Sequence, residues 1–431
     1  MKKFNIILLL TGLFLCTSCL FEQKDIFDQT PAERMEAFLN EYQEILETAE
    51  NGWILEYYPD SDVSYGGYAY HLSFADGKVS ALFQLASDLA KPEESLYRMV
   101  ADDGPVLSFD TYNSYIHYFA TPSGGAENYQ GYRGDTEFKI MGKSKDESII
   151  YLVGKKSGNP CTLTYFEDED PVAYLEACNN MMAELTLPSI TAIEFQVGEL
   201  VGEMESNGVM GLSNLLYYAY PESDEEGAAY VEGALPFCTT PDGIRPFQPI
   251  EIDGVEYDFF YYNAETNRFV TDDEYVSINL IYTPISEQFV ASEWFITKEN
   301  LTGSAATIFA EVEKALKDAG DEIQYLAIGT GMNKGKTFGL EFQCKNGYGT
   351  FTMNNSIKSD DTVGLKYAMK GEGAQTTYLT KMRNILNCFG LTAEKTFKIE
   401  TDNFKSPTWV KLTDTANSGF SIKLVNEKVN Y

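Results

Sequence analysis

Only two histidines, His71 and His117, are present in the 431-residue sequence. Both lie in alternating patterns that predict strands, so half-buried structural histidines are the favoured interpretation. The sequence has no HExxH pair and no G-x-S-x-G turn to frame a nucleophilic serine. These absences disfavour a serine hydrolase and a His-rich metal site. A hydrolase that uses carboxylates alone stays possible, since 65 Asp and Glu give too many candidate pairs to choose from.

Two further segments resemble a phosphate-binding loop and a calcium-binding loop, but each lacks residues that such a loop requires. The segment 329–337 is glycine-rich, but the Walker spacing requires glycine where Thr330 stands, and a strand pattern follows instead of a helix. Asp60-x-Asp62-x-Ser64 alternates oxygen ligands as calcium loops do. It has Tyr65 at the sixth position and His71 at the twelfth, where a calcium loop has Gly and a bidentate acid. We therefore expect no bound metal and no cofactor.

The chain contains 29 tyrosines, and tyrosine is the residue type that most suggests ligand binding in this sequence. Many cluster in polar, glycine-rich segments, where flat amphipathic rings can stack on sugar rings or peptide chains at low entropic cost. The alternative is structural, because Tyr is also a common strand residue. The candidate ligand-binding residues are Tyr57, Tyr58, Tyr65, Tyr68, Tyr112 and Tyr115.

The N-terminus has the layout of a bacterial lipoprotein signal. Lys2 and Lys3 precede a twelve-residue apolar run, residues 4–15, which is too short for a transmembrane helix. A small residue, Ser18, then precedes Cys19. We expect residues 1–18 to be a signal peptide, Cys19 to be lipidated and residues 19–29 to form a tether. The mature protein is then anchored in the outer membrane, at the cell surface or on the periplasmic face.

The charge balance limits the possible partners. Lys and Arg total 32 and the net charge is −33, or about −35 once Lys2 and Lys3 are removed with the signal. Such a field repels nucleic acid, and no basic cluster interrupts it. The cysteines beyond Cys19 lack the close spacing of a redox or zinc motif, and Cys178 and Cys388 lie on apolar helical faces as expected for buried thiols.

The pattern of elements predicts an α+β fold with mainly antiparallel sheets. Thr30-Pro31-Ala32-Glu33 forms a capping box that begins a helix, and Gly52 ends it. Asp76-Gly77, Asp253-Gly254 and Asn346-Gly347 each separate two alternating segments, as in hairpins. Further strands are expected at several sites, among them 114–119 and 338–344, and further helices from Asp170-Pro171, over 304–319 and over about 377–389. Pro188 ends the second helix, which places the predicted domains at 30–188 and 189–431.

Several segments together resemble a known family. Trp53-Ile-Leu-Glu-Tyr-Tyr-Pro59, the Gly66-Gly67-Tyr68 strand, the stretch 104–113 and Leu152-Val-Gly-Lys-Lys-Ser-Gly-Asn159 are similar to the Bacteroidota lipoproteins catalogued as domain of unknown function 4302. The resemblance covers most of the mature chain and brings no established catalytic residues. It implies an accessory role beside outer-membrane importers in nutrient capture.

These observations favour a non-enzymatic envelope lipoprotein that binds a glycan or a peptide for an importer. A structural or scaffolding subunit that contacts only other envelope proteins is the second hypothesis. The third, a carboxylate-dependent hydrolase, is permitted by the histidine count but is not supported by any motif.

Overall fold

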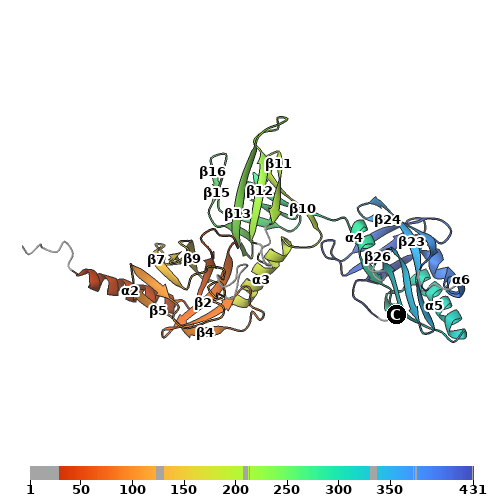
Figure 1. Cartoon of the computed structure of the whole chain (residues 1–431), viewed down its shortest axis with the longest axis horizontal. Coiled ribbons are helices and arrows are strands. Elements are labelled where there is room, and N and C mark those ends of the chain that lie inside the picture. The colour runs from red at the N-terminus through yellow and green to blue at the C-terminus, as the bar shows by residue number, and fades with distance from the viewer. Residues whose placement is uncertain are drawn as a thin grey trace, which may run out of the picture. The chain divides into compact units, whose positions relative to one another are not determined.

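The computed structural model describes residues 29–122, 131–206, 212, 214–330, 337–371, 373, 376–429 and 431 (Figure 1). Antiparallel sheets dominate these residues and a few helices accompany them, which confirms the predicted α+β class. In the described part of the chain, no helix is long and apolar enough to cross a membrane.

The chain divides into two compact units. The first contains the described parts of residues 1–182, 206–216 and 234–259, and the second contains those of 183–205, 217–233 and 260–431. Each unit is thus built from segments that are separated in the sequence. The boundary predicted after residue 188 stays a prediction.

A nine-stranded antiparallel sheet forms most of the first unit. Its strand order is β4-β3-β2-β1-β9-β8-β7-β6-β5. The bounds are β1 Trp53–Tyr57, β2 Tyr68–Ala75, β3 Lys78–Phe83, β4 Glu93–Leu96, β5 Arg98–Ala101, β6 Pro105–Ser108, β7 Glu137–Lys143, β8 Ile149–Gly154 and β9 Pro160–Tyr165.

One face of this sheet is buried in an aromatic core, and helix α2 (Pro31–Thr48) packs against it. Trp53 is 1% exposed, and its indole Nε1 donates to the Leu46 carbonyl of α2 at 3.2 Å. The helix begins as predicted: the Glu33 amide donates to Thr30 Oγ1 at 3.3 Å, and the Thr30 amide donates to Glu33 Oε2 at 2.8 Å. The capping box thus fixes where the chain enters the core.

The opposite face of the sheet is covered in part by helix α3 (Pro171–Glu184). Leu175 and Cys178 of this helix are fully buried against Ala69 of β2 and Leu82 of β3. The prediction that Cys178 is a buried thiol is confirmed, and Cys388 is buried as well. We call the side of the sheet that bears α3 its outer face.

Two predicted hairpins are confirmed, and two other predictions need correction. Asp76-Gly77 joins β2 to β3 with positive φ at both residues, as a type I′ turn requires, and Asp253-Gly254 does the same for β15 and β16. The third turn is shifted by one residue, because Cys344 pairs with Gly347 across Lys345-Asn346. The strand predicted at 114–119 is wrong. Residues 114–120 form helical turns in which the Thr121 amide bonds back to the His117 carbonyl at 2.8 Å.

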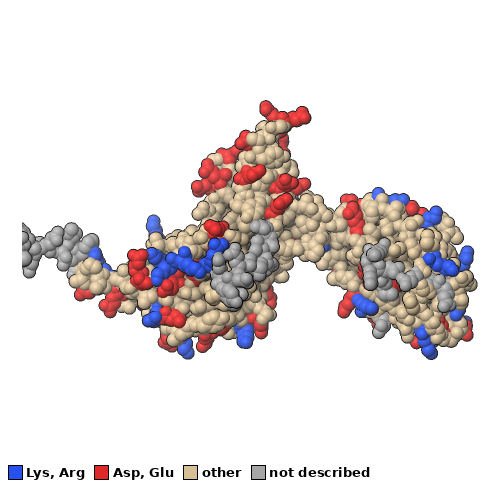
Figure 2. Space-filling model, in the orientation of Figure 1, with Lys and Arg blue, Asp and Glu red and all other residues tan. Residues whose placement is uncertain are grey.

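The strands that follow form an eight-stranded closed barrel and a separate two-stranded ribbon, β15-β16. The barrel order is β10-β11-β12-β13-β14-β17-β18-β19. The bounds are β10 Ile190–Val197, β11 Leu200–Ser206, β12 Leu215–Pro221, β13 Tyr230–Thr240, β14 Gly243–Pro246, β15 Ile250–Ile252, β16 Val255–Tyr257, β17 Phe260–Asn263, β18 Arg268–Val270 and β19 Val276–Tyr282. Figure 2 shows mostly acidic charge over the part that contains β11–β16.

The C-terminal strands form a second closed barrel, in which each strand pairs with its neighbours in sequence and β20 pairs with β27. Helix α5 (Gly303–Asp318) buries Phe309, Val312 and Leu316 in the core of this barrel. The other bounds are α4 Ile285–Ala291, β20 Glu293–Phe295, a 3₁₀ turn Lys298–Asn300, β21 Ile323–Gly329, β22 Gly339–Cys344, β23 Gly347–Ser359, β24 Thr362–Lys370, α6 Thr376–Lys381, α7 Arg383–Cys388, β25 Lys395–Thr401, β26 Trp409–Asp414 and β27 Ser421–Val425. The helix predicted over 377–389 is therefore two short helices.

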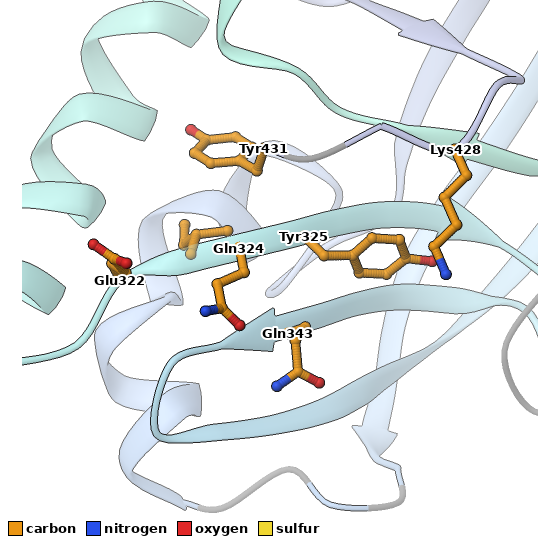
Figure 3. A pocket seen from close by; sticks show the side chains of 7 residues that line it. Glu322, Gln324, Tyr325, Gln343, Lys428 and Tyr431 are labelled. Atoms are coloured by element: carbon orange, nitrogen blue, oxygen red, sulfur yellow. The ribbon is translucent and has the colours of Figure 1, made fainter.

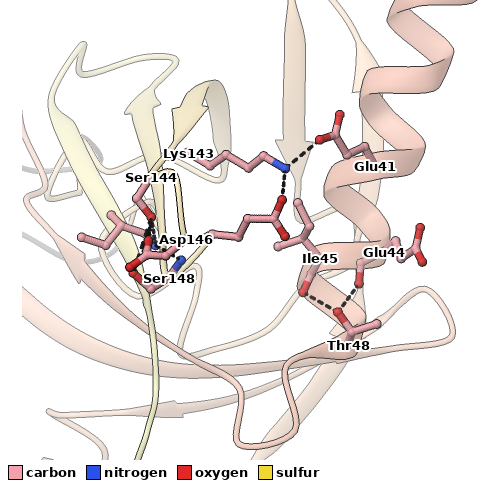
Figure 4. Close-up of polar contacts among 10 residues, drawn as sticks. Glu41, Glu44, Ile45, Thr48, Lys143, Ser144, Asp146 and Ser148 are labelled. Carbon is pink, nitrogen blue, oxygen red and sulfur yellow. Dashed lines mark hydrogen bonds and ion pairs between the residues drawn. The ribbon is translucent and has the colours of Figure 1, made fainter.

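Polar side chains fix the β7–β8 hairpin to helix α2 and order its turn (Figure 4). Lys143 Nζ lies 2.6 Å from Glu41 Oε1 of α2 and 2.6 Å from Glu147 Oε1. Asp146 Oδ1 accepts hydrogen bonds from the hydroxyls of Ser144 at 2.5 Å and Ser148 at 2.9 Å. These donors stabilise the carboxylate and lower the pKa of Asp146 to about 2.

The lowered pKa of Asp146 gives a prediction about the turn. Because the pKa is depressed in the folded state, the stabilisation by Asp146 is present above its ordinary pKa of 3.8 and is lost as pH falls towards 2. Replacing both Ser144 and Ser148 with Ala should return the pKa towards 3.8, as followed by carboxyl NMR chemical shifts. A pKa that stays near 2 in this double variant would contradict the assigned cause.

Candidate functional site

A groove of about 530 Å³ lies on the outside of the C-terminal barrel. We call it the C-terminal groove. Figure 3 shows that its residues come from β21, from β22 and from the tail that follows β27, with Glu322 and Lys428 at opposite ends of the view. The lining residues are Glu322, Ile323, Gln324, Tyr325, Gln343, Lys428 and Tyr431.

The tail is held against the barrel by backbone, hydroxyl and apolar contacts. The Tyr431 amide donates to the Gln324 carbonyl at 3.0 Å, and its phenol donates to Glu313 Oε1 of α5 at 2.7 Å. Val429 packs on an outer apolar cluster that contains Phe295 and Tyr325. These contacts make the tail one wall of the groove.

A β-bulge turns Gln324 towards the groove. Ile323 pairs with Cys344 and Tyr325 pairs with Gln343, so Gln324 is an extra residue between two paired positions. Such a residue is left out of the ladder, and its side chain can be re-aimed. Gln324 is exposed, and its amide lies beside that of Gln343 in Figure 3. Gln343 Nε2 donates to the Cys344 carbonyl at 2.9 Å, which orients the amide.

The phenol of Tyr325 is buried and already has a hydrogen-bond acceptor. Its hydroxyl donates to Glu293 Oε1 at 2.7 Å, and Lys428 Nζ lies 5.3 Å from the centre of its ring. Burial and the bond to Glu293 raise the pKa of Tyr325, so the phenol stays neutral. Lys428 itself is exposed and forms no ion pair with any described residue, so its ammonium can bind a polar ligand group.

The row of side chains continues beyond the groove onto the next strand. Gln343 pairs with both Tyr325 and Tyr348, and directly paired residues of antiparallel strands project from the same face. Tyr348 is 54% exposed. With strands about 4.8 Å apart, the row Tyr325–Gln343–Tyr348 extends about 10 Å across the barrel surface.

A second pocket, of about 370 Å³, lies on the outer face of the N-terminal sheet. We call it the sheet-face pocket. Its side chains come from β1, β7, β8 and β9, and from residues 245–247 at and just after β14. The lining residues are Glu56, Tyr58, Met141, Ile149, Tyr151, Leu152, Val153, Pro160, Cys161, Thr162, Thr164, Arg245, Pro246 and Phe247.

An ion pair is the polar feature of the sheet-face pocket. Arg245 Nη1 lies 2.7 Å from Glu56 Oε1, with the Arg side chain 45% exposed and the Glu side chain 10% exposed. Burial raises the pKa of Glu56, and the attraction of Arg245 opposes that rise. The Tyr58 hydroxyl donates to the Arg245 carbonyl at 3.2 Å, which fixes the backbone that carries the guanidinium.

The six tyrosines singled out from the sequence do not form one site. Tyr57, Tyr58, Tyr65 and Tyr68 are all less than 9% exposed, as the structural alternative predicts for a strand-rich chain. Strand alternation directs Tyr57 and Tyr68 into the aromatic core, where they pack on Phe119. Tyr58 alone of the four lines the sheet-face pocket.

The other predicted positions have mixed outcomes. Tyr112 is 66% exposed, while Tyr115 is half-buried and its hydroxyl donates to the Lys91 carbonyl at 3.1 Å. Asp60 of the calcium-like loop is buried and pairs with Arg133 at 2.7 Å. Within the described ranges no cluster of three or more His, Cys, Asp or Glu could hold a metal ion. Cys19 and residues 331–336 of the glycine-rich loop lie outside the described residues.

The residues of the C-terminal groove were missed by sequence reasoning. Gln343 belongs to the strand predicted at 338–344, and Gln324 and Tyr348 belong to β21 and β23, but their position around one hollow depends on strand pairing. The bulge at Gln324 and the return of the tail have no local sequence signal.

The fold and the two hollows define a mainly antiparallel α+β protein whose pockets lie on the outer faces of its sheets. The family model described as domain of unknown function (DUF4302) matches residues 23–264, more than half of the chain, so the chain belongs to this family. The match includes the whole sheet-face pocket and excludes the C-terminal groove. No curated protein matches the chain.

Bacterial DNA polymerase subunits are among the solved structures that are similar to the chain, at very low similarity. The beta subunit from DNA polymerase of Streptococcus pyogenes shares 11% identity over 92% of this chain and 98% of that chain, with a TM-score of 0.12. The DNA polymerase III beta chain of Streptococcus pneumoniae also has 11% identity over 92% and 98%, with a TM-score of 0.10.

The ion pair of the sheet-face pocket yields a stability prediction. Arg245→Met should lower the free energy of unfolding by about 1–3 kcal/mol, because it leaves the buried carboxylate of Glu56 unpaired and the exposed half of Arg245 moderates the loss. The double variant Glu56→Gln/Arg245→Met should recover most of this loss. Urea unfolding measures both, and equal losses in the two variants would exclude the unpaired charge as the cause.

Proposed function

We propose that this protein is a non-enzymatic, lipid-anchored envelope protein that captures a glycan in its C-terminal groove. The observation that carries the proposal is the row Tyr325–Gln343–Tyr348, which places an amide between two aromatic rings beside further polar groups. A ligand that lies along this row meets the Gln343 amide and the exposed ring of Tyr348, while the ring of Tyr325 is 7% exposed and forms the floor of the groove.

The chemistry of the lining residues favours a glycan over a peptide. Sugar hydroxyls both donate and accept hydrogen bonds, and the amides of Gln324 and Gln343 offer both kinds of partner. Glu322 adds an acceptor and Lys428 adds a donor. The exposed ring of Tyr348 offers a flat apolar surface for the carbon face of a sugar. Among the described residues that line the groove, Ile323 is the one aliphatic hydrocarbon side chain, so an apolar peptide side chain would find little surface to bury.

Binding without hydrolysis is supported by the number of carboxylates at each pocket. Glycoside hydrolysis requires two carboxyl groups that face each other across the bond to be cleaved. Among the described residues that line the C-terminal groove, Glu322 is the one carboxylate, and Glu56 holds that place in the sheet-face pocket. A carboxylate-dependent hydrolase is therefore the weaker proposal.

The envelope location rests on the sequence. The signal-like N-terminus and Cys19 support a lipid anchor in the outer membrane, and the resemblance to importer-associated lipoproteins supports delivery of the glycan to an importer. A scaffolding role stays as the alternative that the binding experiment distinguishes.

Glycan binding can be tested with the mature chain without its lipid, starting near Glu22, on a panel of polysaccharides. We expect saturable binding that weakens at least about tenfold, or 1.4 kcal/mol, in Tyr348→Ala and in Gln343→Ala, because each removes a contact along the row. Tyr230→Ala is the matched control, since Tyr230 is 60% exposed and lies on β13, outside the groove. Affinity electrophoresis or isothermal titration calorimetry measures the change. An absence of binding across the panel would disprove the proposal and direct attention to protein partners.

The anchor gives a separate prediction. Cys19→Ser should abolish incorporation of a radiolabelled fatty acid and move the protein from the membrane fraction to the soluble fraction, because serine has no thiol to acylate. Cys178→Ser is the control, because Cys178 is buried in helix α3 and should leave labelling unchanged. Labelling that persists in Cys19→Ser would place the lipid elsewhere.

A further inference from the structure

We infer that the sheet-face pocket is a second, separate binding site, which takes a small molecule with an apolar body and one carboxylate group. Arg245 binds the carboxylate and the outer face of the sheet holds the apolar body. The inference is independent of glycan binding, because no residue of the C-terminal groove is involved.

The wall of the pocket is apolar at a position where a sheet face is usually covered. Met141 is 65% exposed and Tyr151 is 45% exposed, although both belong to interior strands of the sheet; Met141 lies at a register shift between β7 and β8. Helix α3 packs on β2 and β3, which are separated from β7 and β8 by β1 and β9 in the sheet. Phe247 and Pro246 line the same hollow, which has a volume of about 370 Å³. This volume lies in the range of small-molecule sites.

The guanidinium of Arg245 is held ready for an anion. Glu56 fixes it through Nη1, the Tyr58 hydroxyl fixes its backbone carbonyl, and the Phe259 ring lies 5.5 Å from Cζ. A guanidinium has five N–H donors, and the bond to Glu56 uses one nitrogen. Across the described residues, no second carboxylate forms an ion pair with Arg245. Its half-exposed donors can therefore bind a ligand carboxylate in a bidentate manner.

The geometry favours an anion over a cation. Glu56 is 10% exposed and Arg245 is 45% exposed, so an incoming charged group meets the guanidinium before it meets the carboxylate. The charges of Glu56 and Arg245 cancel, which leaves the pocket neutral for an added carboxylate. The net charge of −33 opposes anions at long range, but salt screens it within about 8 Å at physiological ionic strength.

The test is an NMR titration of the whole mature chain that follows the signal of Met141, a residue of the pocket wall. Octanoate is titrated against protein labelled with ¹³C at its methionine methyl groups, and Met141→Leu assigns the Met141 signal. We expect a saturable shift of that signal with octanoate and at least a tenfold weaker effect with octanamide, which has the same chain without the charge. A shift of equal affinity with octanamide, or no shift with octanoate, would overturn the inference.

Two variants test the role assigned to each partner of the ion pair. Glu56→Gln keeps the Arg245 guanidinium and should retain octanoate binding or strengthen it, because the carboxylate that competes with octanoate for the guanidinium N–H groups is replaced by a neutral amide. Glu56→Gln/Arg245→Met should lose binding at least tenfold, with its unfolding transition as the check that it folds. Octylammonium binding that is lost in Glu56→Gln would show a cation site and overturn the inference. Glycan binding should be unchanged in both variants, so the two proposals fail or succeed separately.

Discussion

The burial of one face of each curved antiparallel sheet is the constraint on which the rest of this structure depends. Side chains alternate between the two faces of a strand, so a strand that sends its bulky rings into a core leaves only the other face for ligands. In the N-terminal sheet the inward positions contain Trp53, Leu55 and Tyr57. Glu56 lies between Leu55 and Tyr57 in the strand, so its side chain projects from the other face and lines the sheet-face pocket.

The same constraint explains why both hollows need a second segment. In both cases the pocket is lined by strand residues and by one further segment of the chain. In the first unit that segment is residues 245–247, and in the C-terminal barrel it is the tail that ends at Tyr431. Each segment is held by a tyrosine hydroxyl, from Tyr58 to the Arg245 carbonyl and from Tyr431 to Glu313.

Hydrogen bonds from tyrosine hydroxyls to carboxylates offer a structural explanation for the abundance of tyrosine. The chain has 65 acidic residues and 32 basic ones, so many carboxylates that approach the core have no cation available. Neutral phenols act as donors instead: Tyr97 bonds Glu47, Tyr325 bonds Glu293 and Tyr378 bonds Asp321, at 2.6–2.7 Å. A hydrogen bond to a charged acceptor is stronger than one between neutral groups. An acidic protein can therefore use tyrosine to satisfy carboxylates that would otherwise be partly buried and unpaired.

Local patterns in the sequence determined the elements of this protein. The capping box at Thr30, the turns at Asp76-Gly77 and Asp253-Gly254 and the burial of Cys178 follow from rules that operate over a few residues. The strand prediction for 114–119 was wrong because the aromatic spacing of this segment fits both a strand and a helical turn. The segment forms the turn, which is stabilised by the hydrogen bond from the Thr121 amide to the His117 carbonyl. Tertiary structure alone decided which face of each strand was left uncovered, and so which tyrosines became core. It also decided that Arg245 meets Glu56, 189 residues earlier in the sequence, and that Tyr431 returns to β21. Such contacts depend on how distant segments pack, and the free energy of that packing has no signature in the local order of residues.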